Sequence, residues 1–425
     1  SRRTSERGSP GSIDPVSARA PDRAPRTFPM DDLDERPAPA PDTGEGRGLW
    51  IPGPVFVRPE LRAVLARPAE GHRTPAIEAT IAALDAPLAR LFGSRPETHA
   101  VGVHSATAPA LMEMGLRATG PRVLCLVNGS FSKRFADIAE ALGKDVTVVR
   151  SPLGAAPDLA RARDLLTEGD APFDAVTVCT SETSTGAYAS PAEIGAALAD
   201  RRGALLLVDA VTLLGAAPID ASDHGLDFVL AGTQKALALP PGLGLYAAST
   251  SMLEAATRAV SGSWFLDLAR IHAAHVARKP PMTPTVPLLR ALETQLAAIA
   301  SGALEDQLGG ATESRRAGPY VRRFERHAEM ARRTRARCAE VGVQPYGTAA
   351  GSPTVTCLDL GAAGLDAARV RGLCAERGLT VAKGYGELGS TCIRIGHMGD
   401  RSLAELDGLL DVLTSAICGT LRPPQ

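Results

Sequence analysis

Short, uninterrupted apolar runs alternate with longer amphipathic stretches through the first two thirds of the chain, and this alternation constrains the fold more than any other feature. The apolar runs are predicted strands at residues 122–127, 145–149, 175–179, 204–208, 228–231 and 244–247. A strand that is apolar throughout is typical of a sheet covered on both faces. The stretches between them, such as residues 131–142 and 191–201, have helical periodicity. The sequence therefore predicts an α/β fold around a mostly parallel sheet.

The last third of the chain has a different pattern. After a long helical stretch at residues 286–308, strands are predicted at residues 354–359, 380–383 and 392–396, and helices at residues 366–377 and 403–418. This pattern is typical of a small α+β domain. We therefore expect an N-terminal arm over residues 48–75, a large domain over residues 76–310 and a small C-terminal domain over residues 311–425.

Residues 1–47 are rich in proline, arginine, serine, aspartate and glycine and have almost no apolar periodicity. Such a segment cannot bury enough apolar surface to offset the entropy that it would lose on ordering. The sequence predicts a disordered tail here, and an arm that binds a partner is the alternative.

Composition argues against several classes of protein. The 46 Lys and Arg residues nearly balance the 47 Asp and Glu residues, so the net charge of −1 does not favour binding to nucleic acid or to an anionic membrane. We see neither an apolar run long enough for a transmembrane helix nor a secretory leader. Seven scattered cysteines without a Cys-x-x-Cys pair favour reduced thiols and a cytoplasmic protein. No metal-ligand spacing surrounds His72 or His397, so we expect no metal site.

Two residues that follow apolar strands point to chemistry on an amino group. Asp209 ends the run Leu205-Leu206-Leu207-Val208, and Lys235 closes Gly232-Thr233-Gln234-Lys235 after the next run. The chain has only five lysines among its 46 basic residues, and a lysine, unlike an arginine, can lose its proton and form an imine. Ligands of open α/β sheets bind outside the carboxyl ends of the strands. There the carboxylate suits a protonated pyridine nitrogen, so the pair predicts an imine lysine beside an electron-sink cofactor.

Each of these residues alone has an ordinary explanation. A lysine after a strand is usually at the surface, and an aspartate there usually caps a helix or makes a structural hydrogen bond. The same caution applies to Ser105-Ala106-Thr107, which precedes an apolar helical stretch. Small residues there would let backbone N–H groups at a helix N-terminus approach a phosphate, with an ordinary helix cap as the alternative.

Short motifs spread over residues 49–418 resemble those of the class V aminotransferases, in particular the alanine/serine–glyoxylate (or –pyruvate) branch. In the family's order they are Pro52-Gly53-Pro54, Gly71-His72-Arg73, Asn128-Gly129-Ser130-Phe131, Glu182-Thr183-Ser184-Thr185-Gly186, Val208-Asp209-Ala210-Val211, Gly232-Thr233-Gln234-Lys235 with Pro240-Pro241-Gly242, Thr283-Pro284-Thr285-Val286-Pro287 and Arg394-Ile395-Gly396-His397-Met398-Gly399. The resemblance implies fold type I of the enzymes that use pyridoxal 5'-phosphate (PLP), with a mostly parallel seven-stranded sheet in the large domain. It also implies a transaminase that moves an amino group between a small amino acid and a 2-oxo acid such as glyoxylate or pyruvate.

The resemblance further implies a role for each matching residue. Lys235 would hold PLP as a Schiff base and Asp209 would pair with the pyridine nitrogen, so these two are the expected catalytic residues. Arg394 and Gly53 would bind the substrate, Arg394 through a bidentate contact with its carboxylate. Thr285 would reach the cofactor phosphate of the neighbouring subunit, which implies a homodimer with shared active sites. The other expected cofactor contacts are Ser105, Ala106, Thr107 and Gln234 at the phosphate, Phe131 stacked on the ring, Thr183 near the ring hydroxyl, and Val211.

Two positions depart from the family pattern and leave the substrate and the reaction type open. Thr180 stands where the family often has a histidine, and Met282 stands nearest to the place of a tyrosine that faces the cofactor phosphate across the dimer. Decarboxylation, β-elimination or epimerisation in a specialised pathway is therefore an alternative, and a non-catalytic binding protein of the same fold is another. Sulfur removal needs a reactive cysteine on a mobile loop. Cys374 and Cys392 lie in a predicted helix and a predicted strand, so neither suits that reaction.

Overall fold

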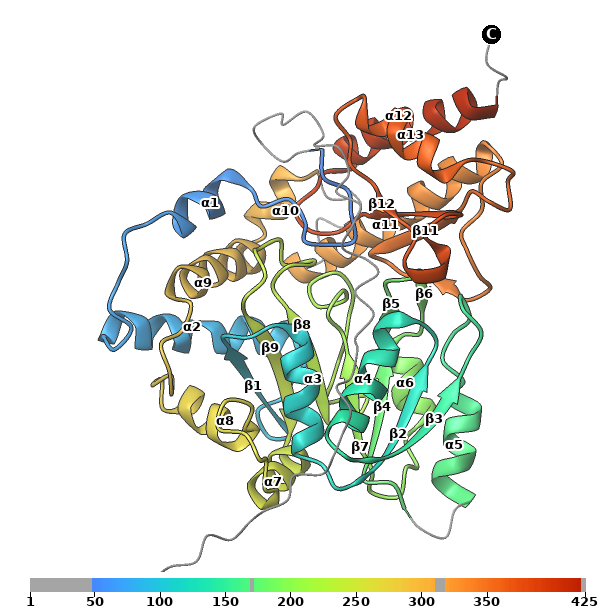
Figure 1. The fold of residues 1–425 in the computed structure, drawn as a ribbon. Helices are drawn as coiled ribbons and strands as arrows, with labels where there is room; N and C mark the ends of the chain where they lie inside the picture. Colours follow the sequence, from blue (N-terminus) through green and yellow to red (C-terminus); the bar gives the residue numbers. More distant parts are fainter. Residues whose placement is uncertain (1–47, 169–171, 310–317, 422–425) are drawn as a thin grey trace, which may run out of the picture. The chain divides into compact units, whose positions relative to one another are not determined.

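Seven strands form the main sheet in the order β1-β9-β8-β7-β4-β2-β3 (Figure 1). The computed structural model describes residues 48–168, 172–309 and 318–421. The strands are β1 (His99–His104), β2 (Arg122–Val127), β3 (Asp145–Arg150), β4 (Ala175–Cys179), β7 (Leu205–Asp209), β8 (Phe228–Gly232) and β9 (Gly244–Ser249). Neighbouring strands are parallel except at β9, which is antiparallel to β8 and β1. The mostly parallel seven-stranded sheet expected from the sequence is confirmed.

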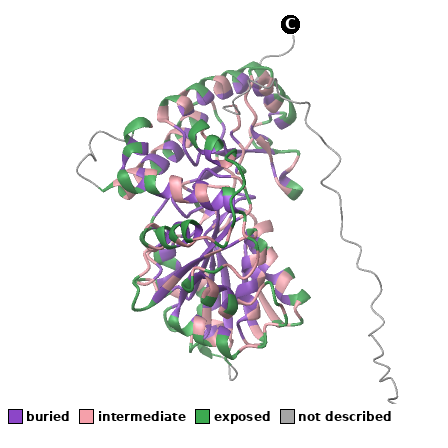
Figure 2. Cartoon of the chain, turned by 90° about the vertical axis from the view of Figure 1, so that its left-hand side faces the viewer, coloured by how far each residue is buried: buried purple, intermediate pink, exposed green. Residues whose placement is uncertain are grey.

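The strands are apolar at successive positions because both faces of the sheet are buried. Along β7, Leu206 and Val208 pack into one apolar core, whereas Leu207 packs into a second core. Successive side chains of a strand point to opposite faces, so the two cores lie on the two faces of the sheet. Figure 2 shows the buried strands between helices whose outer surfaces are exposed.

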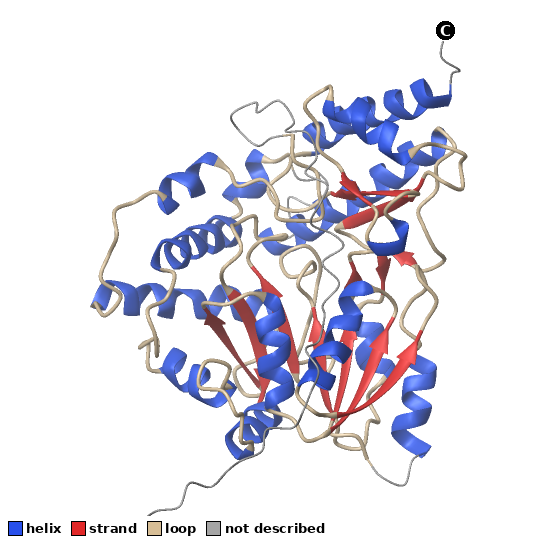
Figure 3. Ribbon diagram, viewed as in Figure 1, coloured by secondary structure: helices blue, strands red, loops and turns tan. Residues whose placement is uncertain are grey.

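Helices cover both faces of the sheet (Figure 3). The core that contains Leu206 also receives apolar side chains from α1 (Pro59–Leu65), α2 (Pro75–Phe92), α5 (Leu159–Glu168), α6 (Pro191–Ala197), α9 (Val286–Ser301) and α10 (Ala303–Gln307). The core that contains Leu207 receives them from α3 (Ala108–Arg117), α4 (Ser130–Ala141), α7 (Thr250–Arg258) and α8 (Leu268–Val276). None of the helices in the described ranges is long and apolar enough to cross a membrane.

Two helical stretches differ from the sequence-based expectation. The stretch over residues 286–308 is divided into α9 and α10 by Gly302, whose φ of +80° is a left-handed conformation that glycine adopts readily. The stretch over residues 191–201 is helical only to Ala197. In both cases the amphipathic pattern continues past the point where the backbone leaves the helix.

A smaller antiparallel sheet follows, with strand order β11-β13-β12. Its strands are β11 (Val355–Asp359), β12 (Ala382–Lys383) and β13 (Cys392–Gly396), and its helices are α11 (Pro319–Glu340), α12 (Ala367–Ala375), α13 (Leu403–Leu421) and the short 3₁₀ helix η2 (Gly386–Leu388). A third sheet, β10-β6-β5, is formed by β5 (Ser181–Glu182), β6 (Ala187–Tyr188) and β10 (Ala350–Gly351). The domain boundary expected near residue 310 and the tail expected over residues 1–47 fall outside the described residues and stay predictions.

Residues 48–54, which we call the entry segment, pack on their own chain. The N–H of Trp50 donates a hydrogen bond to the carbonyl oxygen of Thr380 at 2.8 Å, and the N–H of Gly396 donates to the carbonyl oxygen of Trp50 at 2.8 Å. The Trp50 side chain is buried in the core of the small sheet. Residues 48–50 therefore pair with the edge of that sheet.

A buried network of charges joins α11 to the main sheet. Arg323 binds Glu305 and Asp400, each at 3.0 Å, and Arg326 binds Glu305 at 2.7 Å. All four side chains are at most 1% exposed. Arg323 also donates to the carbonyl oxygen of Ala236, in the loop that follows β8. Because a buried charge without a partner is costly, these contacts fix the position of that loop relative to α11.

Candidate active site

A cavity of about 320 Å³ lies at the carboxyl ends of β7 and β8. Its lining comes from the entry segment, the N-terminal halves of α3 and α4, β5 with the turn after it, the end of β7, and the loops after β7 and β8. The residues are Gly53, Pro54, Ala108, Pro109, Met112, Phe131, Arg134, Ser181, Thr183, Asp209, Val211, Thr212, Gln234, Lys235 and Pro241. The volume and position are typical of a small-molecule site in an open α/β fold. The cavity brings together seven of the residues singled out in the sequence, namely Gly53, Phe131, Thr183, Asp209, Val211, Gln234 and Lys235.

Asp209 ends β7, and one hydrogen bond holds its carboxylate while another holds its backbone. Oδ1 accepts a hydrogen bond from the N–H of Val211 at 2.8 Å. The hydroxyl of Thr180, the residue that replaces the family's histidine, donates to the carbonyl oxygen of Asp209 at 2.9 Å. Burial raises the pKa of Asp209 to about 6, although the Val211 N–H acts in the opposite direction. Within the described ranges Asp209 forms no ion pair, so an added cation would stabilise this carboxylate.

Lys235 lies in the loop after β8, and its Nζ donates a hydrogen bond to the carbonyl oxygen of Pro52. Burial, together with the positive charges of Arg394 and Arg134, lowers the pKa of Lys235 to about 8, although the charge of Asp209 acts in the opposite direction. A larger fraction of this amine is therefore neutral near pH 7 than for an exposed lysine. The neutral amine is the form that attacks an aldehyde.

Gly53 lies directly against this lysine. A Cβ atom on Gly53 would lie 2.6 Å from the Cδ and 2.8 Å from the Nζ of Lys235. The φ of Gly53 is +105°, a conformation that other residues rarely adopt. The position therefore requires glycine in order to leave room for the lysine.

Phe131 is the second residue of α4, and a buried carboxylate holds it in place. The N–H of Phe131 donates to Glu182 Oε2 at 3.1 Å, and the N–H of Ser132 donates to the same atom at 2.9 Å. On the other side, the guanidinium carbon of Arg134 lies 4.4 Å from the centre of the Phe131 ring. These contacts fix the ring at the cavity wall, where it can cover a planar ligand.

The turn between β1 and α3 leads into a helix N-terminus beside the cavity. This turn contains Ser105, Ala106 and Thr107, and Thr107 is the N-cap of α3. None of the three residues lines the cavity, but the first two residues of the helix do, so the N-terminal turn of α3 faces the cavity. Backbone N–H groups at such a terminus attract a phosphate. Gln234 lines the same cavity and offers an amide to that ligand.

Arg394 lies in β13 at the edge of the cavity, and its side chain is 9% exposed. Nε donates to the carbonyl oxygen of Lys383 at 2.9 Å, and Nη1 donates to that of Thr183 at 3.2 Å. Arg394 does not itself line the cavity, whereas Thr183 does. Among the described residues it has no carboxylate partner, so it is not a surface ion pair. A buried guanidinium of this kind suits an incoming carboxylate.

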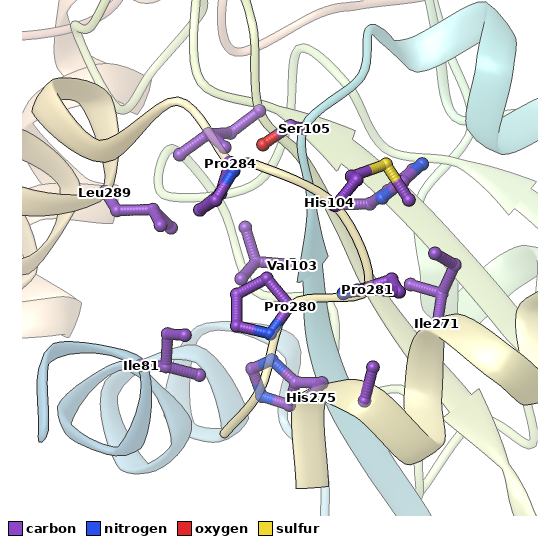
Figure 4. Close-up of a pocket in the computed structure, with 13 residues that line it drawn as sticks. Ile81, Val103, His104, Ser105, Ile271, His275, Pro280, Pro281, Pro284 and Leu289 are labelled. Carbon is purple, nitrogen blue, oxygen red and sulfur yellow. The ribbon is translucent and has the colours of Figure 1, made fainter. Parts of the chain in front are cut away.

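Thr285 does not line the cavity. Its N–H donates to Oγ of Ser105 in the same chain at 3.1 Å, and the residue is exposed. Ser105 also borders a separate, much smaller cavity of about 40 Å³ between β1, α8 and the segment before α9. Figure 4 shows Pro284 beside Ser105 at one end of this cavity and His275 at the other. Since its lining is mainly apolar and includes neither Asp209 nor Lys235, we do not assign the chemistry to it.

The residues around the larger cavity fit PLP. Lys235 offers an amine of lowered pKa for the aldehyde, and Asp209 offers a buried carboxylate without an ion-pair partner in the described ranges for the pyridine nitrogen. Phe131 would cover the ring, and the first turn of α3 would bind the phosphate. The described residues contain no group of three or more His, Cys, Asp or Glu side chains arranged to hold a metal ion.

Sequence reasoning missed three features of this site. Arg134 lies three residues after Phe131, so the helical spacing could have placed both on one side of α4. The Pro52 carbonyl and the ring of Tyr385 come from distant parts of the chain, and no local pattern announces that they approach the cavity.

Comparison with known proteins agrees with this site. The model of the family described as "Aminotransferase class-V" matches residues 102–307, a range that includes Asp209, Lys235 and Thr285.

Three similar proteins illustrate the likeness. The chain is 30% identical to the soluble hydrogenase, small subunit, of Synechococcus sp., covering 83% of this chain and 88% of that protein. It is 29% identical to the serine–glyoxylate aminotransferase of Methylorubrum extorquens, covering 85% of this chain and 89% of that protein. The solved structure of an alanine–glyoxylate aminotransferase from Nostoc sp. is 25% identical, covers 93% of this chain and 100% of that chain, and superposes with a TM-score of 0.76.

Proposed function

Because the chain belongs to the class V aminotransferases and is a PLP-dependent transaminase of fold type I, we propose that it transfers the amino group of a small amino acid such as alanine or serine to a 2-oxo acid such as glyoxylate or pyruvate. The observation that carries the proposal is the meeting of Lys235 and Asp209 in one cavity. At its edge lies the guanidinium of Arg394, which forms no ion pair with the residues that the structure describes. The names of the relatives from Methylorubrum extorquens and Nostoc sp. support the choice of substrates.

Bound PLP supplies a conjugated ring that accepts the electrons left when the substrate's α-carbon loses a proton. Lys235 would hold this cofactor, and its Nζ would take up the proton that the substrate's α-carbon loses. Asp209 would keep the ring nitrogen protonated, because a buried carboxylate favours a cation in contact with it. Arg394 orients the substrate by its carboxylate, and Phe131 excludes water from one face of the ring.

The remaining contacts are assigned by position. The first turn of α3, preceded by Ser105, Ala106 and Thr107, binds the phosphate together with Gln234. Thr183 and Val211 line the cavity wall with Asp209. The carbonyl oxygen of Thr183 also accepts a hydrogen bond from Arg394. Gly53 leaves the space that the substrate amine needs beside Lys235.

A half-reaction tests the proposal. Purified protein saturated with PLP is mixed with alanine or serine in the absence of any 2-oxo acid, and the products are counted. Transamination predicts one equivalent of 2-oxo acid per active site and no further turnover until an acceptor is added, which is the ping-pong pattern. Decarboxylation would instead release carbon dioxide, and β-elimination would give pyruvate repeatedly without an acceptor. Either result would contradict the proposal.

We also propose that the protein is a homodimer in which Thr285 reaches the partner's cofactor phosphate. Thr285 is exposed at the end of a proline-stiffened segment, and the segment between α7 and α8 exposes Trp264 and Phe265, which are 57% and 42% exposed. Large exposed apolar side chains are typical of an interface.

The cysteines bear on the compartment in which the protein works. None of the seven thiols is in a disulfide, which supports a reducing compartment such as the cytoplasm.

Mixed dimers test the shared site. Chains with Lys235→Ala and chains with Thr285→Trp are each expected to be inactive, but a mixture that exchanges subunits places one intact lysine beside one intact threonine. We expect partial recovery of activity in the mixture and none in either parent. An active monomer in sedimentation experiments, or a fully active Thr285→Trp variant, would contradict this assembly.

A further inference from the structure

Tyr385 lies between two residues of the candidate site. The centre of its ring is 5.2 Å from that of Phe131, and the guanidinium carbon of Arg394 is 5.3 Å from the Tyr385 ring centre. Tyr385 comes from the loop between β12 and η2, whereas Phe131 comes from α4. The tyrosine therefore joins the residue proposed to cover the cofactor to the residue proposed to bind the substrate carboxylate.

A second large cavity, of about 300 Å³, adjoins this contact. It is lined by Val127, Gly129, Ser130, Lys133, Arg150, Ser151, Leu153, Ser184, Thr185, Tyr385, Glu387 and Leu388. Phe131 lines the cofactor cavity but not this one, and Tyr385 lines this one but not the cofactor cavity. Because the two rings touch, they form part of the partition between the cavities.

The lining of the second cavity mixes apolar and polar residues and includes an available cation. Its charged lining residues are Lys133, Arg150 and Glu387. Lys133 is paired with Asp137, whereas Arg150 forms no ion pair within the described ranges. Five hydroxyl-bearing residues of the lining, Tyr385 among them, add hydrogen-bonding groups, so a large anionic side chain would find suitable partners there if it could enter.

We propose that Tyr385 is a specificity-determining residue that restricts the substrate to small side chains, an inference that rests on the transaminase function proposed above. A substrate that is held by its carboxylate at Arg394 and by its amino group at Lys235 has its α-carbon close to this partition. A side chain of one or two heavy atoms would need no space beyond the cofactor cavity. A longer side chain must displace that ring from both Phe131 and Arg394 in order to extend into the second cavity.

Two variants of Tyr385 separate this role from a structural one. Tyr385→Ala removes the ring, so the ratio of kcat/KM for glutamate to kcat/KM for alanine is expected to rise about tenfold or more, mainly through a lower KM for glutamate. Tyr385→Phe keeps the ring and is expected to keep the ratio within about threefold of the wild type. Should the alanine variant fail to fold, Tyr385→Leu removes the aromatic contacts while retaining more volume, and a smaller rise of the same ratio is expected.

Binding of ligands that do not react gives a readout independent of turnover. Glutarate and acetate are titrated into the PLP-loaded proteins by calorimetry, and Tyr385→Ala is expected to gain about tenfold in affinity for glutarate relative to acetate. Adding Arg150→Ala to Tyr385→Ala should remove most of this gain. Leu153→Ala is the matched control, because it enlarges the second cavity without opening the partition, and it should leave the preference of the wild type unchanged.

The outcomes distinguish the two proposals. If the wild type transaminates but the substrate ratio and the glutarate affinity of Tyr385→Ala are unchanged, the role of Tyr385 is wrong and the function stands. If the wild type forms no 2-oxo acid from any amino acid, the proposed function fails, and calorimetry still decides whether Tyr385 closes the second cavity. Equal gains in affinity for glutarate in Leu153→Ala and Tyr385→Ala would show that Tyr385 does not separate the two cavities.

Discussion

The Nζ of Lys235 donates a hydrogen bond to the carbonyl oxygen of Pro52, which lies 183 residues earlier in the chain. The entry segment thus forms one wall of the space around the lysine. In this position the Pro52 carbonyl stabilises the protonated amine, and the amine must leave this contact before it can bind a cofactor. The next residue, Gly53, faces the same side chain.

Replacing Gly53 by alanine is predicted to impair cofactor binding more than folding. The added methyl group would lie 2.6 Å from Cδ of Lys235, so the lysine must move away from its present position. We expect the Kd for PLP to rise at least about tenfold, as measured by absorbance titration. Gly143→Ala is a suitable control, because its Cβ would meet no atom within 4 Å although its φ is also positive, at +73°. Similar affinities in both variants would show that Gly53 does not set the space for the lysine.

The capture of PLP should depend on pH with a midpoint near the lowered pKa of Lys235, about 8. Only the neutral amine attacks the aldehyde, so the rate is expected to rise with pH below this value and to level off above it. Arg394→Gln removes one of the charges that depress this pKa, and the midpoint should then move upward. Stopped-flow absorbance between pH 6 and pH 10.5 measures both curves. A rate that still climbs at pH 10 in the wild type would indicate an ordinary exposed lysine.

Asp209→Asn is predicted to reduce kcat by about a hundredfold or more, with a much smaller change in KM, because a neutral amide does not hold a ring nitrogen protonated. Asp227→Asn is the matched control. Asp227 is also buried at the sheet, but it pairs with Arg201 at 2.7 Å and does not line the cavity. Its replacement should lower stability and leave kcat close to that of the wild type. Equal losses of kcat in the two variants would argue against a special role for Asp209.

Glu305→Gln is predicted to lower the free energy of unfolding by about 3–5 kcal/mol, because it removes the carboxylate that Arg323 and Arg326 share in the interior. Glu329→Gln provides the comparison at the surface. Glu329 also binds two arginines, yet it is partly exposed and its partner Arg332 is mostly exposed, so the expected loss is about 1 kcal/mol or less. Urea unfolding of both variants measures the difference. Comparable losses in the two variants would mean that the buried network adds little to the free energy of unfolding.

The fold could be predicted from the sequence because its strands are buried on both faces. Continuous apolar runs such as Leu205-Leu206-Leu207-Val208 have few other interpretations, and the predicted bounds of β2, β4 and β13 match the structure residue for residue. The end of α9 could not be predicted in this way, since a single left-handed glycine interrupts a continuous amphipathic pattern.

Local patterns predicted the candidate site where it depends on strand ends, and the family resemblance added residues such as Gly53 and Phe131. Asp209 and Lys235 follow neighbouring parallel strands, so topology alone brings them together. The contacts of Tyr385 with Phe131 and Arg394 depend on how the small sheet lies against α4, which no local pattern encodes. Thr285 shows the same limit, because one chain cannot reveal which residues of a partner it meets.

The most direct test of the account is the identity of the lysine that binds PLP. The loaded protein is reduced with borohydride, digested, and analysed by mass spectrometry for the peptide that carries the reduced cofactor. We predict a single labelled residue, Lys235, complete loss of label and of transamination in Lys235→Ala, and no loss in the control Lys279→Ala, which changes an exposed lysine. A label on any of the other four lysines, or an active Lys235→Ala protein, would contradict the central claim.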